Sequence, residues 1–146
     1  IYKDGKKEGI VTRWYENGQK YLEGTYKDEK KDGWETEWYE DGQKIKEATH
    51  KDGKADGLVT LWYANGQKSS EGIFRDGKLY GLTTTWYENG QKMDEGIWKD
   101  GIPDGLRTSW YPNGQKSGKT LYEDGVVISS KCWDEDGNEI DCDELE

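Results

Sequence analysis

The chain has little of the material from which a thick core is built. Only 31% of its 146 residues are hydrophobic and 36% are charged, and it contains two prolines, one histidine and one methionine. No apolar run is long enough to span a bilayer, and no segment resembles a signal peptide. Because the chain begins at Ile1 without a methionine, we expect a mature or trimmed form. The low hydrophobic content of the chain excludes a large aliphatic core.

Aromatic residues take the place of the missing aliphatic ones. The chain contains eight tryptophans, ten tyrosines and one phenylalanine, and most of them recur at fixed intervals. Large planar side chains can bury area even in a thin structure. We therefore expect a folded chain, although its polarity alone is typical of disorder.

The negative charge of the chain is concentrated at its C-terminal end. The formal net charge is −10, but residues 133–146 contain eight acidic residues and no basic one. The other 132 residues contain 23 acidic and 21 basic residues, which is a net charge of −2. A nearly neutral array with an acidic end has no basic surface for nucleic acid and attracts anionic lipid only weakly. We expect no nucleic-acid partner, and the charge disfavours a membrane lipid as partner.

A seven-residue segment returns every 24 residues. It reads WYENGQK from Trp14 and WYEDGQK from Trp38, and three further copies follow. A second series, which begins with YKDGKKEG from Tyr2, has the same period. Such a period indicates a repeat array in which each unit packs on its neighbours. The structural positions of the repeat are Trp14, Trp38, Trp62, Trp86 and Trp110 and the turn glycines Gly18, Gly42, Gly66, Gly90 and Gly114.

Each unit has the pattern of two antiparallel strands and two tight turns. In the third unit an alternating stretch from Leu58 to Trp62 is followed by Asn65-Gly66, and a second stretch ends at Asp76-Gly77. Asn-Gly and Asp-Gly are strong hairpin signals because these residues tolerate positive φ. The sequence predicts an all-β fold, an elongated array of antiparallel hairpins that forms one twisted open meander of about twelve strands.

Alternation along the strands predicts one constant face and one variable face. An apolar residue, a threonine and a tryptophan recur two residues apart, as at Leu58, Thr60 and Trp62. Side chains two apart share a face, so this repeated face is expected to hold the sheet together. The positions between them vary, which indicates either a partner surface or tolerance of solvent. The candidate partner face comprises Arg13, Glu35, Glu37, Leu61, Thr85 and Arg107.

Glycines within the strands are expected to receive aromatic rings. Three of them lie two residues before an aromatic residue, Gly24 before Tyr26, Gly72 before Phe74 and Gly96 before Trp98. Glycine weakens a strand unless a side chain packs over the bare backbone. The face that supplies the ring stays open, because a one-residue change in a loop inverts the facing.

The C-terminal segment departs from the repeat. We expect 24-residue repeats over residues 1–125, and a cap hairpin with an acidic tail over residues 126–146. Two cysteines, Cys132 and Cys142, bracket the turn at Asp136-Gly137. With a two-residue loop Cys132 would face Asp141, so a disulfide needs a bulge or a different loop. We predict the Cys132–Cys142 disulfide, with two free thiols as the alternative.

No catalytic, cofactor or metal site is predicted, and we expect the protein not to be an enzyme. Gly72–Lys78 matches the first seven places of a phosphate-binding loop, but Leu79 replaces the hydroxyl residue that holds magnesium, and a strand follows instead of a helix. His50 occupies an aromatic position of the repeat and has no second histidine. Aligning Gly137 with the glycine of a calcium loop places Cys132 at the first ligand position.

The unit resembles a known repeat. With its WYxNGQK turn, EGxY strand and KDGKxDG turn, it is similar to the bacterial variant of the MORN repeat, the membrane occupation and recognition nexus family, from residue 2 to about residue 125. The resemblance implies an elongated antiparallel meander that serves as an interaction or scaffolding module. Bacterial members are often called antitoxin-like and often occur on secreted or surface proteins, which implies an extracellular or cell-surface location. Similar repeats occur in plant phosphatidylinositol phosphate kinases, but the sequence has no kinase motifs, so a kinase label would be an analogy only.

Two functions are compatible with these observations. The first is a non-catalytic module for protein–protein interaction or scaffolding, with another protein as its partner. The alternative is binding of lipid headgroups or glycans by exposed aromatic ladders, because a row of Trp or Tyr rings makes a stacking platform. The sequence identifies neither the partner nor the oligomeric state.

Overall fold

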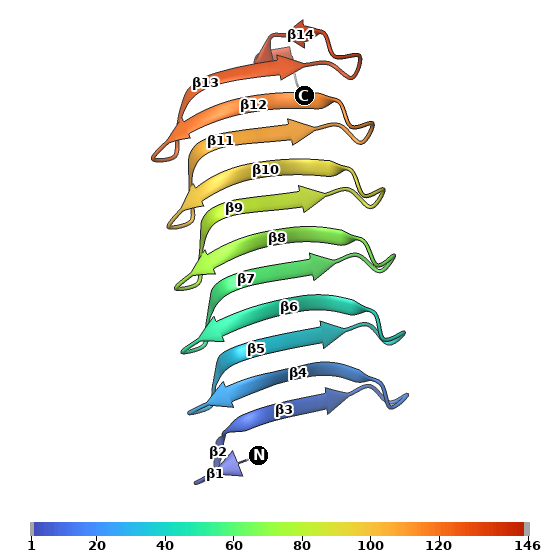
Figure 1. Ribbon diagram of the computed structural model, residues 1–146, viewed down its shortest axis with the longest axis vertical. Coiled ribbons are helices and arrows are strands. Elements are labelled where there is room, and N and C mark those ends of the chain that lie inside the picture. Colours follow the sequence, from blue (N-terminus) through green and yellow to red (C-terminus); the bar gives the residue numbers. More distant parts are fainter. Residues whose placement is uncertain (1, 145–146) are drawn as a thin grey trace.

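The protein folds into one open antiparallel sheet. The computed structural model describes residues 2–144. It contains a twelve-stranded sheet in which each strand pairs with the strands before and after it in the chain, in the order β3 to β14 (Figure 1). A separate hairpin of β1 and β2 precedes the sheet. The predicted all-β open meander of about twelve strands is confirmed.

The strands of the repeats are eight or nine residues long from β4 onward and shorten at the C-terminal end. The separate hairpin comprises β1 (Tyr2–Lys3) and β2 (Lys6–Lys7), and a 3-10 turn, η1, spans Cys142–Glu144. The strands of the sheet are β3 (Gly9–Trp14), β4 (Lys20–Lys27), β5 (Lys30–Trp38), β6 (Lys44–Lys51), β7 (Lys54–Trp62), β8 (Lys68–Arg75), β9 (Lys78–Trp86), β10 (Lys92–Lys99), β11 (Ile102–Trp110), β12 (Lys116–Glu123), β13 (Val126–Trp133) and β14 (Glu139–Ile140).

Two-residue turns connect the strands at one end of the sheet, which we call the Asp-Gly end. Asp52 and Gly53 have φ angles of 51° and 85°. Positive φ at both central residues matches the twist of a hairpin, and Asp-Gly adopts it readily. The second unit has Glu29, at a φ of 66°, in the place of the glycine. The Gly53 N–H also donates to the Lys31 carbonyl at 2.8 Å, so the turn is bonded to the neighbouring unit.

Five-residue loops connect the strands at the other end, which we call the Trp end. The Tyr39 N–H donates to the Gln43 carbonyl at 2.8 Å, and the Gly42 N–H donates to the Tyr39 carbonyl at 2.9 Å. The tight turn expected at this glycine is therefore part of a wider loop that includes the glutamine. The Tyr39 hydroxyl donates to the Trp62 carbonyl at 3.3 Å, one unit along the chain. The equivalent bond is made by Tyr15, Tyr63, Tyr87 and Tyr111.

Register shifts bend the strands near the Asp-Gly end. Gly24 pairs with Glu35 but Tyr26 pairs with Lys31, so two steps along β4 match four steps along β5. Bulges of this kind turn a strand and increase its local twist. Equivalent shifts recur between β6 and β7, β8 and β9, and β10 and β11. They give the strands their curved outline in Figure 1.

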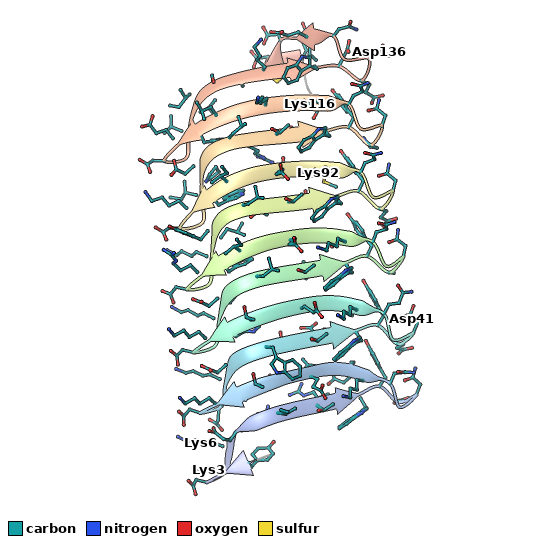
Figure 2. All side chains as sticks on the ribbon, in the orientation of Figure 1. Lys3, Lys6, Asp41, Lys92, Lys116 and Asp136 are labelled. Atoms are coloured by element: carbon teal, nitrogen blue, oxygen red, sulfur yellow. A yellow bond between two sulfur atoms is a disulfide. The ribbon has the colours of Figure 1, made fainter. Side chains whose placement is uncertain are left out.

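The sheet is a single layer, and its least exposed residues are small or polar. These are Gly24, Gly72, Gly96, Gly118, Ala48, Cys132, Thr36, Thr60, Thr84 and Glu35. Figure 2 shows side chains spread over the whole length of the sheet and crowded around the turns at both ends. Backbone ladders and contacts between neighbouring units therefore hold the fold together, as expected for a repeat array.

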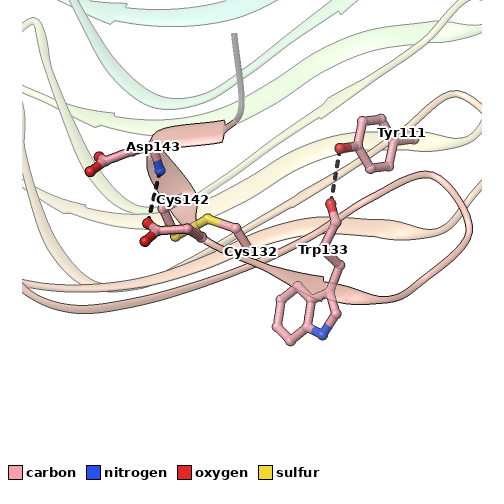
Figure 3. Close-up of a disulfide and its surroundings, with 6 residues drawn as sticks. Tyr111, Cys132, Trp133, Cys142 and Asp143 are labelled. Carbon is pink, nitrogen blue, oxygen red and sulfur yellow. Dashed lines mark hydrogen bonds between the residues drawn. A yellow bond between two sulfur atoms is a disulfide. The ribbon is translucent and has the colours of Figure 1, made fainter.

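A disulfide staples the C-terminal hairpin. β13 pairs with only two residues of β14, Cys132 with Ile140 and Trp133 with Glu139. The chain then leaves the ladder, and η1 brings Cys142 to Cys132, where a disulfide joins Cα atoms 5.1 Å apart (Figure 3). The loop is wider than two residues, because Asp134 and Asn138 repeat the backbone bond of the Trp end at 2.9 Å. This different loop moves Cys132 out of register with Asp141 and leaves Cys142 free to return.

Candidate functional site

Cross-strand pairing sorts the side chains onto two faces. Thr60 pairs with Glu71, and Leu58 pairs with Ile73, whereas Val59 between them belongs to the opposite face. We call the side of Thr60 the threonine face, and it carries the five repeat tryptophans. We call the other side the ring face, after its recurring aromatic position. That position is occupied by Tyr26, His50, Phe74, Trp98 and Tyr122.

A polar column runs along the threonine face beside the tryptophans. The Thr60 hydroxyl donates to Glu71 at 3.2 Å, and Lys68 lies 2.6 Å from the same carboxylate oxygen. The hydrogen bond from Lys68 lowers the pKa of Glu71 most, burial acts against it, and the Thr60 hydroxyl adds to the lowering. The Lys68 ammonium lies 5.9 Å from the ring centroid of Trp86 in the next unit. The lysine and glutamate charges of the polar column are therefore paired with each other.

The same cation–π contact recurs in neighbouring units. Lys44 lies 5.7 Å from the ring centroid of Trp62, and Lys92 lies 5.7 Å from that of Trp110. An ammonium over a tryptophan face is attracted by the ring quadrupole and occupies that face. Three of the five repeat tryptophans are therefore covered by a lysine of the preceding unit, while Trp14 is 57% exposed.

An exposed aliphatic row crosses the threonine face toward the Asp-Gly end. Its members, one from each strand from β7 to β12, are Leu58, Ile73, Leu82, Ile97, Leu106 and Leu121. They pair across the strands in three couples, and their exposed fractions lie between 40% and 51%. At about 4.8 Å per strand the aliphatic row is about 24 Å long. The expectation that this face serves packing is wrong for the aliphatic row, because a single-layer sheet has no second layer to cover it.

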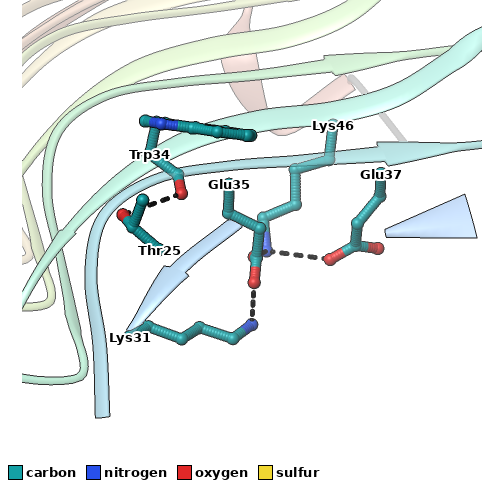
Figure 4. Close-up of polar contacts among 6 residues, drawn as sticks. All are labelled: Thr25, Lys31, Trp34, Glu35, Glu37 and Lys46. Atoms are coloured by element: carbon teal, nitrogen blue, oxygen red, sulfur yellow. Dashed lines mark hydrogen bonds and ion pairs between the residues drawn. The ribbon is translucent and has the colours of Figure 1, made fainter. Parts of the chain in front are cut away.

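An ion cluster with a buried centre lies on the ring face and includes the predicted partner residues Glu35 and Glu37 (Figure 4). Glu35 is only 2% exposed, and its carboxylate contacts Lys31 and lies 3.0 Å from the Lys46 ammonium. Lys46 also lies 3.4 Å from Glu37. Burial acts to raise the pKa of Glu35, but the hydrogen bonds from Lys31 and Lys46 outweigh it and leave the pKa below its ordinary value. Glu35 therefore does not offer its charge to a partner.

The other predicted partner residues also lie on the ring face, but not as one charged surface. Arg13 is exposed on the edge strand β3, whereas Leu61 and Thr85 are half-buried on β7 and β9. The Arg107 Nε donates to both carboxylate oxygens of Asp94, at 3.0 and 2.8 Å. Most of the charged residues at these variable positions are thus paired with opposite charges within the sheet.

The strand glycines are covered by cross-strand side chains more than by rings. A Cβ atom at Gly24 would lie 3.3 Å from the Glu35 Cβ, and one at Gly96 would lie 3.3 Å from the Arg107 Cγ. The Trp98 ring is near Gly96 too, with its Nε1 at 3.6 Å. The expectation of a ring at every glycine is therefore wrong, because direct cross-strand neighbours approach most closely.

His50 lies half-buried on the ring face, and burial lowers its pKa. Its Nδ1 is buried without a hydrogen-bond partner in the structure. Within residues 2–144 no three His, Cys, Asp or Glu side chains are gathered as they would be around a metal ion. The same residues form no helix that is long and apolar enough to cross a membrane.

Sequence reasoning missed half of the aliphatic row. Ile73 and Ile97 follow a glycine and Leu121 follows a threonine in the second strand of their units, where the first two units have Thr25 and Thr49. The alternation of the second strand already placed these apolar residues on one face. Only the pairing register shows that they stand beside Leu58, Leu82 and Leu106.

Comparison with known families gives a match along most of the chain. The model of the MORN repeat variant family matches five consecutive segments, residues 7–28, 31–52, 55–76, 79–100 and 103–124. Each of the last four segments covers the second strand of one Asp-Gly hairpin, the Trp-end loop and the first strand of the next hairpin, and the first segment covers β3, its Trp-end loop and β4. No match was found among curated proteins.

Proposed function

Because the chain belongs to the MORN repeat variant family, we propose that this repeat module binds another protein and acts as a non-catalytic scaffold for it. The observation that carries the proposal is the aliphatic row. Monomeric soluble proteins seldom leave a contiguous apolar patch open without a use. The six members stand on a rigid ladder, so a partner would meet a preformed apolar strip and order few side chains on binding.

The position of the aliphatic row favours a protein over a small ligand. It lies on an open, gently curved face, whereas small-molecule sites are concave and enclose most of their ligand. Polar residues border the aliphatic row on the side of the Trp end, since Glu71 and Glu95 are the same-face neighbours of Ile73 and Ile97. An apolar centre with a polar border is the usual anatomy of a protein interface.

Binding of glycans or lipid headgroups by the aromatic ladder has less support. Lysines already occupy the faces of Trp62, Trp86 and Trp110. A stacking ligand would have to displace these ammonium groups one by one. The near-neutral repeats give no additional attraction toward anionic lipid.

The Cys132–Cys142 disulfide supports a location of the protein in an oxidising compartment. Disulfides persist in secreted and cell-surface proteins and are rare in reducing compartments. We therefore propose that the interaction takes place outside the cytosol, at the cell surface or in a secreted form.

The proposal is tested by comparing two charge substitutions at aliphatic residues of similar exposure. Leu82 lies in the aliphatic row and is 50% exposed, whereas Ile10 holds the same place in the first unit, outside the row, and is 53% exposed. Proteins captured by immobilised wild type, Leu82→Asp and Ile10→Asp are quantified by mass spectrometry, after circular dichroism has shown that all three are folded. A partner is expected to be retained by wild type and Ile10→Asp and to be reduced about tenfold by Leu82→Asp. Equal capture by all three proteins would contradict the proposal.

A further inference from the structure

β13 is an edge strand whose ladder is mostly open. On β11, the six residues Gly105–Trp110 pair with β12, whereas on β13 only Cys132 and Trp133 pair with β14. The loop after Trp133 repeats the loop after Trp110, so Ile128–Lys131 correspond to Gly105–Thr108. Within residues 2–144, Ile128–Lys131 have no strand partner on the outer side. Four ladder positions are therefore open.

The disulfide explains why the chain does not fill these positions itself. Cys132 pairs with Ile140, so a β14 strand continued in this register would place Cys142 opposite Ser130. Instead Cys142 is bonded to Cys132, and η1 lies to the side of the ladder (Figure 3). The disulfide thus fixes η1 beside β13 at Cys132 and keeps Cys142 out of a continued β14 ladder.

The open edge begins at an apolar segment and lies in an acidic surrounding. Val126 and Val127, which precede the open positions, and Ile128, the first of them, are 64%, 54% and 54% exposed, and Ser129, Ser130 and Lys131 follow. Residues 123–144 contain nine acidic residues and one basic residue, Lys131, whose ammonium lies 3.4 Å from Glu139. No proline or run of lysines protects the edge, although natural edge strands commonly carry such residues.

The opposite edge of the sheet is different. β3 follows the β1–β2 hairpin, in which Tyr2 pairs with Lys7 as Tyr26 pairs with Lys31. The β1–β2 hairpin precedes β3 in the chain and is not part of the twelve-stranded sheet. At the β13 edge, by contrast, the chain has already left the ladder after two residues of β14.

We propose that the open ladder positions of β13 bind an extended, basic segment of a partner protein, which adds to the sheet as an antiparallel strand. The backbone N–H and C=O groups of alternate residues within Ile128–Lys131, those that point away from β12, would supply the hydrogen bonds, as in other cases of strand addition. Aliphatic residues of the segment would cover Ile128, and its basic residues would face the acidic residues of the cap. A second copy of this chain is a poor occupant, because it would bring its own acidic cap against the first.

A short fluorescent peptide of alternating valine and lysine tests the proposal. Its binding to the full chain under oxidising conditions is measured by fluorescence anisotropy, and the amide resonances of the chain are followed by NMR. We expect saturable binding with shifts at Ile128–Lys131. Replacing the lysines of the peptide by glutamate, or methylating alternate peptide nitrogens, is expected to weaken binding at least about tenfold.

Two substitutions on the protein separate the edge from the aliphatic row. Ile128→Lys adds a positive charge to the open edge and is expected to weaken peptide binding about tenfold. Leu58→Lys changes an aliphatic residue of similar exposure in the aliphatic row and is expected to leave peptide binding unchanged. Equal binding of the methylated peptide, equal loss in both variants, or absence of any shift at Ile128–Lys131 would overturn the proposal. Dimers in sedimentation that Ile128→Lys abolishes would assign the edge to a second copy instead, and would also overturn it.

Discussion

The Tyr63 hydroxyl donates a 2.6 Å hydrogen bond to the carbonyl of Trp86, one unit further along the chain. The tyrosine of the WYxNGQK segment therefore joins two units by a hydrogen bond, which we call a tie. The ties lie at the Trp end, where loops replace the backbone ladder. In a repeat array the contacts between neighbours decide whether the units unfold together or separately. These ties are thus a direct source of cooperativity along the sheet.

Removing one tie is expected to cost stability in proportion to its geometry. Tyr63→Phe deletes the hydroxyl of a well-formed bond and is expected to lower the free energy of unfolding by about 1 kcal/mol. Tyr39→Phe deletes a bond of 3.3 Å and is expected to cost less. Urea unfolding of both variants measures the difference. Equal costs, or a larger cost for Tyr39→Phe, would contradict a cost that follows the geometry of the bond.

The turn of the second unit is expected to be improved by glycine. Glu29 has a φ of 66° in a place where the equivalent turn residues, such as Gly53, are glycine. A residue with a side chain pays about 1–2 kcal/mol in the left-handed region. Glu29→Gly is therefore expected to raise the free energy of unfolding by about 1 kcal/mol, and Gly53→Glu is expected to lower it by a similar amount. Thermal unfolding that shifts in the same direction for both variants would contradict this explanation.

Acid is expected to destabilise the sheet through the carboxylates of the threonine face. The pKa values of Glu23, Glu71 and Glu95 all lie below the ordinary value, each chiefly through a hydrogen bond from a lysine of its own strand. A carboxyl group with a lowered pKa in the folded protein contributes stability that is fully present above its unfolded pKa of about 4.3. That contribution is lost as the pH falls through the folded pKa.

The free energy of unfolding in urea is therefore expected to decrease between about pH 5 and pH 3. A variant with Gln in place of Glu23, Glu71 and Glu95 serves as the control and is expected to show a flatter dependence. Parallel pH profiles of wild type and control would show that these groups are not responsible.

The ion cluster on the ring face is expected to be replaceable as a unit but not piece by piece. Glu35→Val leaves Lys31 and Lys46 without their buried partner and is expected to cost about 1–3 kcal/mol. The third unit carries Ala55, Val59, Leu61 and Ser70 at the places of Lys31, Glu35, Glu37 and Lys46. Transplanting these four residues together is expected to restore stability to within about 1 kcal/mol of wild type, because apolar packing often replaces a buried ion pair at little cost. A transplant less stable than Glu35→Val would contradict this expectation.

Periodicity was enough to predict the sheet and its strand order. The 24-residue spacing of the tryptophans and the Asp-Gly signals specify successive hairpins. In a meander each strand pairs only with the strands before and after it in the chain, so the strand order follows. The same alternation placed Arg13, Glu35, Glu37, Leu61, Thr85 and Arg107 on one face, where the structure has them. Local signals were sufficient because nearly every contact in a repeat array is between neighbours.

Exposure could not be predicted in the same way. Alternation tells which side chains share a face, but it does not tell whether that face is covered. Leu58 looked like a core residue and is 51% exposed, whereas Glu35 looked like a surface residue and is buried. Lys46 compensates the buried charge of Glu35 but lies eleven residues away in the chain. Only the register of β5 against β6 brings the two side chains together.

The proposed partner surface is tested most directly by site-specific photo-crosslinking at two adjacent residues. Leu82 lies on the threonine face in the aliphatic row, and Thr83 lies on the ring face. A photoreactive amino acid is introduced at either position, and the crosslinked products formed with a partner selected by the Leu82→Asp comparison are identified by mass spectrometry. We expect crosslinks to that partner from position 82 and none from position 83. Crosslinks from position 83 alone would contradict the assignment of the threonine face as the binding surface.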